Sequence, residues 1–291
     1  MPKIVILGEC AYDIHFAGAT PGESYPGGRM LNAAAILGRE GRQVTYVGEC
    51  ARDRMGDLII SYLDSAGVVT SSIDRYTEGV TPLNLFFEAD NTHPTPSVVH
   101  YRQFPKEKFD VVWPRIDAGD IVVFGSTMAI DSRVRPQLCE LLAHARTRGA
   151  LIVYQPGFLP GQTPRITHVM PYILENLETA HIVVGRDADM ATMFGSSDAA
   201  QVYTDKIEFY CPTYIQLDTA PDSEGRVSLL IPNQIMTRAV SAEAGGLKWQ
   251  SAALASIIAA LCDHNVTPDR LLPPSMPLAE ALITAAAVTQ K

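Results

Sequence analysis

A pair of glycines and a few polar side chains near the N-terminus have the types and the spacing of a ligand-binding site. Gly27 and Gly28 stand directly before a stretch with helical character, and Asn32 falls in its first turns. Glycines allow the backbone to approach a ligand closely, and a helix N-terminus offers N–H groups without an intrahelical partner. Asp13 follows the first apolar strand, and open α/β sheets bind ligands at such strand ends. These four residues predict a pocket for a small ligand.

A second glycine pair lies near the C-terminus, before a long apolar helix predicted through residues 252–261. Gly245 and Gly246, with Lys248 close by, can hold an anion such as phosphate, because a helix N-terminus attracts negative charge. The same glycines can equally serve only a tight loop before a packed helix. The sequence leaves both interpretations open.

The elements that must position these residues alternate between short β-branched runs and longer helical patterns. Continuous apolar runs separated by helices indicate a mainly parallel sheet covered by helices on both faces. We expect one α/β domain over residues 1–291. The predicted strands lie at residues 4–7, 44–47, 121–124, 151–154, 182–184, 214–217 and 227–231, with helical stretches at 57–66, 138–142 and 190–194.

One region departs from this alternation. Residues 83–88 and 97–102 have strand patterns with no helix between them, so they predict a β-hairpin. A hairpin inserted into an α/β domain is typical of a lid. We expect a small β lid formed from segments near 13–20 and 82–102.

Composition excludes several classes of partner. The 291-residue chain carries a formal net charge of -9 at pH 7, whereas nucleic acid and anionic membranes require clustered Lys and Arg. Its five cysteines are widely spaced and include no C-x-x-C pair, which fits a reducing compartment. The first residues lack a signal-peptide pattern, and no run approaches the roughly 18 apolar residues of a membrane span. We therefore expect a cytoplasmic protein that binds neither nucleic acid nor membrane.

The order of the N-terminal features resembles the first signature of the ribokinase-like PfkB carbohydrate kinases. The resemblance implies a ribokinase-like α/β fold, with a mainly parallel central sheet flanked by helices and a small β lid. The matching features after the glycine pair are Asn32, the Ala-rich helix, a strand ending in Gly48, the turn Asp53-x-x-Gly56, and Gly67-Val68.

The resemblance also implies roles for individual residues. In the family, an Asp at the position of Asp13 accepts sugar hydroxyls, and the positions of Gly27, Gly28 and Asn32 contact the sugar. Arg29 stands where some members carry a substrate-contacting lysine. A sugar or nucleoside is thus the expected ligand, ATP and Mg²⁺ are the expected co-substrate and cofactor, and a homodimer through the lid is the expected assembly.

The second signature of the family differs here. In the family it is Asp-Thr-x-Gly-Ala-Gly-Asp, in which the last Asp is the general base and the glycines stabilise the moving phosphoryl group. The matching segment is 240–249, and alignment on Trp249 places Leu247 at the base position. Glu243 is the nearest carboxylate and the candidate substitute base.

The magnesium-organising motif of the family differs as well. Its Asn-x-x-Glu aligns with residues 186–189, where Arg186 replaces the Asn and Asp189 keeps a carboxylate. Asp189 is therefore the candidate metal ligand.

Three functions remain open at this point. The chain can be a kinase that transfers the γ-phosphoryl group of ATP to a sugar or nucleoside hydroxyl held by Asp13. It can instead be a catalytically inactive relative that binds a sugar or phosphosugar as a sensor or partner. The third is a purely structural subunit. Asp13 and Asn32 argue against it, since neither serves an obvious packing need.

Overall fold

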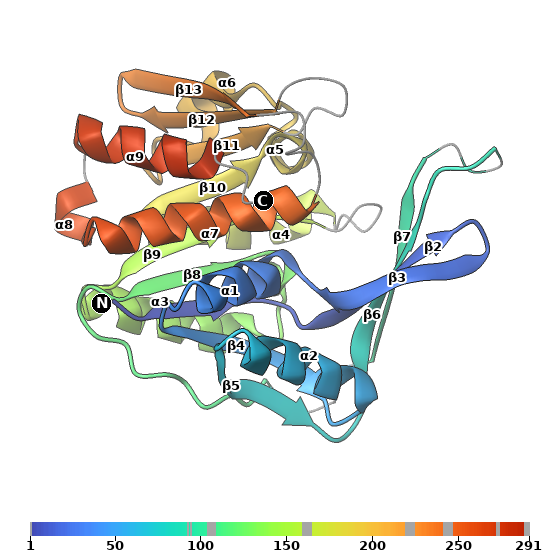
Figure 1. Cartoon of the computed structure of the whole chain (residues 1–291). Helices are drawn as coiled ribbons and strands as arrows, with labels where there is room; N and C mark the ends of the chain where they lie inside the picture. Colours follow the sequence, from blue (N-terminus) through green and yellow to red (C-terminus); the bar gives the residue numbers. More distant parts are fainter. Residues whose placement is uncertain are drawn as a thin grey trace.

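The structure is a computed structural model of the whole chain (Figure 1). It describes residues 2–91, 93, 95–103, 109–158, 165–218, 225–240, 247–271 and 274–287, and for residues 247 and 248 it describes the backbone alone.

Within the described residues, nine strands form one large sheet in the order β13-β12-β11-β10-β9-β8-β1-β4-β5. Neighbouring strands from β5 to β11 are parallel, and β12 and β13 add an antiparallel edge. This confirms the predicted mainly parallel sheet. The strands are β1 (Ile4–Leu7), β4 (Val44–Ala51), β5 (Val69–Tyr76), β8 (Ile121–Gly125), β9 (Leu151–Gln155), β10 (Ile182–Arg186), β11 (Tyr214–Asp218), β12 (Gly225–Ile231) and β13 (Gln234–Val240).

Helices cover both faces of this sheet. Successive residues of a strand point to opposite faces, so Ile4 and Ile6 enter one hydrophobic core while Val5 and Leu7 enter the other. The first core lies under α1 (Arg29–Arg39), α2 (Arg54–Ser65), α7 (Leu247–Asp263), α8 (Pro268–Leu271) and α9 (Met276–Ala287). The second lies under η1 (Thr127–Ile130), α3 (Arg135–Thr147), α4 (Ile166–Thr179), α5 (Asp187–Phe194), α6 (Ala199–Val202) and η2 (Tyr203–Ile207). The fold is therefore a mainly parallel α/β sheet flanked by helices, as the sequence predicts.

A second, four-stranded sheet projects from one end of the large one (Figure 1). Its order is β3 (Thr20–Gly27), β2 (Ala11–Ala17), β6 (Val80–Phe87) and β7 (Ser97–Gln103). The antiparallel pairing of β6 with β7 confirms the predicted hairpin. β2 runs parallel to β6, so the segments near residues 13–20 and 82–102 meet in one sheet.

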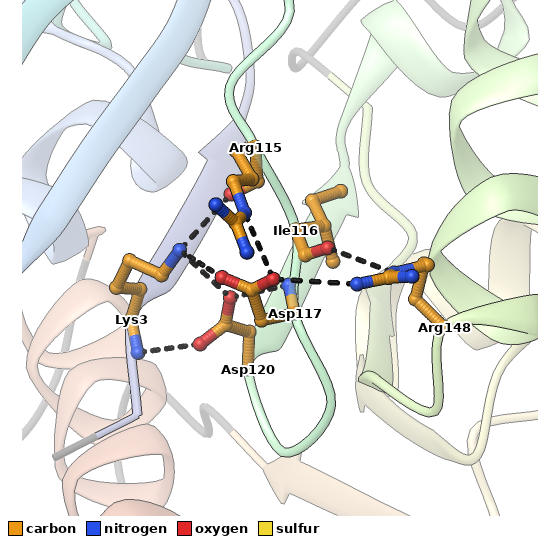
Figure 2. A network of polar contacts seen from close by, with 6 residues as sticks. All are labelled: Lys3, Arg115, Ile116, Asp117, Asp120 and Arg148. Carbon is orange, nitrogen blue, oxygen red and sulfur yellow. Dashed lines mark hydrogen bonds and ion pairs between the residues drawn. The ribbon is translucent and has the colours of Figure 1, made fainter.

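A polar network fastens the start of β1 at the opposite end of the large sheet (Figure 2). Lys3 donates from its backbone N–H to Asp120 at 2.9 Å and from Nζ to Asp117 at 2.9 Å. Asp117 also accepts from Arg115 at 3.0 Å and pairs with Arg148 at 3.4 Å. Hydrogen bonds from Lys3 and then from Arg115 lower the pKa of Asp117 to about 2.

Among the residues that the structure describes, no helix has both the length and the apolar character needed to span a membrane.

Candidate functional site

A pocket lies where the carboxyl ends of β1, β8 and β9 meet the four-stranded sheet and the first turns of α1 and α7. It brings together the sequence-predicted Asp13, Gly28, Arg29 and Asn32. Its full lining is Glu9, Ala11, Asp13, Tyr25, Gly28, Arg29, Asn32, Asn84, Phe86, His100, Ser126, Thr127, Gly157, Phe158 and Ser251.

Asp13 lies in β2 and is buried, with 6% of its surface exposed. It accepts a hydrogen bond from Nδ2 of Asn84 at 2.7 Å. Burial raises the pKa of Asp13 to about 6, although the bond from Asn84 opposes that rise. Gly27 lies beside this carboxyl group: a Cβ at position 27 would stand 2.0 Å from Cγ of Asp13. The glycine therefore makes the room that the carboxylate occupies.

Asn84 and His100 extend this arrangement across the small sheet. Because Nδ2 of Asn84 donates to Asp13, its Oδ1 is the acceptor for Nδ1–H of His100. Burial, and then the charge of Arg102, lowers the pKa of His100 to about 4, so the imidazole is neutral at pH 7. Its Nε2 is then an acceptor. Sequence reasoning missed both residues, and the signal for Asn84 was a polar side chain set between Leu83 and Leu85 in a strand.

The glycine-rich entry to α1 presents the next group of residues. Gly28 is the helix N-cap with φ 112°, a conformation that favours glycine. Oδ1 of Asn32 accepts from the hydroxyl of Tyr62 at 3.3 Å, which directs the Asn32 side chain within the first turns. Arg29 turns inward, with 9% of its side chain exposed, and its Nη1 donates to Asp189 at 3.1 Å.

Asp189 is held mainly by two arginines. Arg186 donates to both of its oxygens at 2.6 Å, and the backbone N–H of Phe158 donates to Oδ1 at 3.2 Å. Burial raises the pKa of Asp189, but the charge of Arg29 and the bonds from Arg186 outweigh it and leave the pKa below its ordinary value. In the described part of the chain, no group of three His, Cys, Asp or Glu side chains is placed to hold a metal ion.

Ser126, Thr127 and Glu9 form the floor near β8. Oε1 of Glu9 accepts from the hydroxyl of Thr127 and from the backbone N–H of Met128. Ser126 has φ 55° and ψ -158°, a strained backbone conformation that is rare for a residue with a side chain and is concentrated at functional sites. These residues follow strand ends, but their types alone did not single them out.

The C-terminal candidates fall largely outside the described residues. Glu243, Gly245 and Gly246 are among those not described, and so are the side chains of Leu247 and Lys248. The predicted long apolar helix is confirmed as α7, which begins at Leu247. Ser251, in its first turns, lines the pocket.

Comparison with known sequences identifies one family. A profile described as "pfkB family carbohydrate kinase" matches residues 1–208. The 5-dehydro-2-deoxygluconokinase of Clostridium beijerinckii is 31% identical over 81 residues, which is 28% of this chain and 24% of that protein. The protein of the same name from Clostridium perfringens strain 13 is 26% identical over 140 residues, or 46% and 40% of the two chains. The matched segments thus span less than half the length of these relatives.

Solved structures share the whole architecture. The aminoimidazole riboside kinase of Salmonella enterica, complexed with aminoimidazole riboside and an ATP analogue, has a TM-score of 0.78 at 14% identity, covering 98% of this chain and 91% of its own. The apo fructokinase of Vibrio cholerae O395 has a TM-score of 0.76 at 14% identity, covering 98% and 96%. Identities this low establish the fold alone.

Proposed function

The chain belongs to the pfkB family of carbohydrate kinases, and we propose that it binds a sugar or nucleoside in the pocket around Asp13 and phosphorylates a hydroxyl of that ligand with ATP. The observation that carries this proposal is the buried carboxylate of Asp13 facing the pocket. A desolvated carboxylate gains strongly from hydrogen-bond donors, and Asn84 donates to only one of its oxygens. The hydroxyls of a sugar supply donors of the required kind.

The remaining lining suits the same ligand. Neutral His100 offers an acceptor at Nε2, and Asn32 offers its amide from the first turns of α1. Phe86 and Phe158 give the pocket apolar surface against which the C–H face of a sugar ring can pack. A few polar groups among apolar ones is the usual lining of a small-molecule site.

The family implies ATP as the phosphoryl donor and Mg²⁺ as its cofactor. The predicted metal ligand does not suit a divalent cation as it stands, because both oxygens of Asp189 accept from Arg186 and one also accepts from Arg29. The side chains of this chain bind and orient the hydroxyl-bearing ligand.

A second candidate function is binding without phosphoryl transfer, as a sensor or partner. Two specific observations favour it: the paired arginines on Asp189, and Leu247 at the position of the general base in the family signature. Leu cannot accept the proton of a substrate hydroxyl, and loss of a general base typically lowers the rate by ~10²–10⁴-fold.

One experiment decides between the two. Purified protein is tested by calorimetry and by product detection with Mg-ATP against ribose, fructose, nucleosides and 5-dehydro-2-deoxygluconate. A phosphorylated product that Asp13→Asn abolishes supports the kinase. Ligand binding without product, and without Mg-ATP binding, supports the sensor.

The control for this experiment is Asp269→Asn, which alters an exposed carboxylate in α8, outside the pocket lining. It should behave as the unmodified chain does. No binding of any compound in the panel would count against both candidate functions.

A further inference from the structure

The two ends of the pocket differ in charge. Asp13, Asn84 and His100 form one end on the four-stranded sheet, where the groups available to a ligand are mainly acceptors. The other end lies against β9 and α5, where the guanidinium of Arg29 packs on Gly157. A Cβ at position 157 would stand 1.7 Å from Nη2 of Arg29, so a side chain there would displace the guanidinium.

The cation at this second end is not fully matched by its carboxylate partner. Arg186 and Arg29 share Asp189, and the exposed fractions of the three side chains are 12%, 9% and 3%. Arg186 makes the closer, two-pronged contact at 2.6 Å, whereas Arg29 makes a single bond at 3.1 Å. The cluster therefore holds two buried positive charges and one negative charge, and the charge of Glu9 also acts on Arg29.

A buried guanidinium needs hydrogen-bond acceptors for its N–H donors, and Arg29 has several such donors. A guanidinium carries five N–H donors in a fixed fork that matches a carboxylate. Among the described residues, the bond to Asp189 is the hydrogen bond that Arg29 forms. Arg29 also lines the pocket, so its remaining donors lie beside the space that a ligand would enter.

We infer that Arg29 forms the anion-binding end of the pocket, and that the ligand is a sugar acid with its hydroxyls at Asp13 and its carboxylate at Arg29. This inference rests on the proposed binding of a sugar-like ligand and names its class. A carboxylate brings one negative charge, and its two oxygens can accept from the donors that Arg29 does not use on Asp189. A phosphate brings nearly two, and Glu9 and Asp13 already face the same pocket.

The test uses neutral and acidic compounds matched in carbon skeleton. D-gluconate is compared with D-glucitol, and D-glucuronate with D-glucose, by calorimetry without ATP. We expect the unmodified chain to bind the better acid about 10- to 100-fold more tightly than its neutral partner, as a charge-assisted hydrogen bond does. Arg29→Gln should remove this preference, so that the acid and its neutral partner bind the variant with similar affinities.

The matched control is Arg135→Gln. Arg135 is also buried and ion-paired, with Glu175, but it does not line the pocket. Its loss should lower stability and leave the preference for the acid intact. Arg29→Lys is the second variant, in case Arg29→Gln does not fold: it keeps a charge for Asp189 but loses the fork, and should reduce the preference without abolishing it.

The outcomes separate the two proposals. Binding of the neutral compounds without a preference for either acid overturns the inference and leaves the proposed ligand class standing. A preference for the acid that survives Arg29→Gln also overturns it, as does tighter binding of glucose 6-phosphate than of both acids. Failure to bind any of these compounds, or the panel used for the proposed function, overturns both.

Discussion

At the scale of single residues, the site is built by placing a carboxylate where water cannot reach it easily. Asp13 is buried in β2 and has one hydrogen-bond donor, Asn84, among its described contacts. The ionised form is therefore poorly solvated in the unliganded protein, and its pKa rises to about 6. A ligand that brings hydroxyl donors removes this penalty, which couples binding to the protonation state of Asp13.

The first prediction follows from that penalty. The folded pKa of Asp13 lies above its ordinary value of 3.8, so the folded state holds the proton more tightly and stability falls as pH rises from about 4 to about 6. Asp13→Asn should remove this pH dependence and raise the free energy of unfolding at pH 7 by about 1–3 kcal/mol. Urea unfolding at pH 5 and pH 7 measures it. Equal or lower stability of the variant at pH 7 would contradict the assignment.

The second prediction concerns the space beside that carboxylate. Gly27→Ala places a methyl group 2.0 Å from Cγ of Asp13, so the strand or the carboxyl group must move. We expect a loss of about 1–3 kcal/mol of stability and of ligand binding. Gly22→Ala is the matched control in the same strand, since its nearest contact would be 3.4 Å and ordinary. Thermal unfolding and calorimetry compare the stability and the ligand affinity of the two variants. Similar losses in both would contradict the role assigned to Gly27.

Sequence reasoning placed four of its candidate residues at the pocket and missed their partners for a physical reason. Asp13, Gly28, Arg29 and Asn32 belong to short ordered motifs that can be recognised locally. Asn84 reaches Asp13 only because β2 and β6 pair in parallel, which joins residues 71 positions apart. Such a register is invisible in a single sequence.

At the scale of elements, the buried strands and the helices with a clear hydrophobic periodicity were predictable from the sequence, whereas the edge strands were not. β3 was missed because Pro21 and Pro26 argue against a strand. Both prolines fit in β3 because it is the edge strand of its sheet. β13 and β5 are edge strands too, and their residues are largely exposed or half-buried. Without a continuous apolar run, they carry little strand signal.

The third prediction belongs to the network that fastens β1 (Figure 2). The pKa of Asp117 is about 2 in the folded chain, below its ordinary 3.8, so its contribution to stability is present above pH 4 and is lost as pH falls toward 2. Asp117→Asn should flatten the acid limb of the stability profile and leave Lys3 and Arg115 without this partner. Chemical unfolding between pH 2 and pH 6 measures it, with Asp269→Asn as the control. An unchanged acid limb would show that the network does not act this way.

At the scale of the whole molecule, the pocket is shared between two sheets. The large sheet supplies strand ends, and the helices α1 and α7 that pack on it supply their first turns. The small sheet supplies Asp13, Asn84 and His100. The small sheet projects away from the helices that cover the large one (Figure 1). We propose that it acts as the lid, so that a ligand is enclosed by bringing the two sheets together.

The fourth prediction concerns the outer strand of that lid. β7 is an edge strand, and Val99 and Tyr101 expose 51% and 53% of their surfaces on one of its faces. An apolar edge strand invites pairing with another chain, and we propose that two copies of this chain pair there. Val99→Glu with Tyr101→Glu should turn a dimer into a monomer in sedimentation experiments, because like charges would face each other across the interface.

The matched control for the dimer is Ile235→Glu. Ile235 exposes 55% of its surface on β13, the edge strand at the far end of the other sheet. It is equally apolar and equally exposed but belongs to no part of the lid, so this variant should remain dimeric. A monomeric parent chain at tens of micromolar, or a dimer that survives the β7 substitutions, would contradict pairing through the lid. If the β7 variant is a monomer that still binds its ligand, each pocket is complete within one chain, and the contact between lids serves assembly alone.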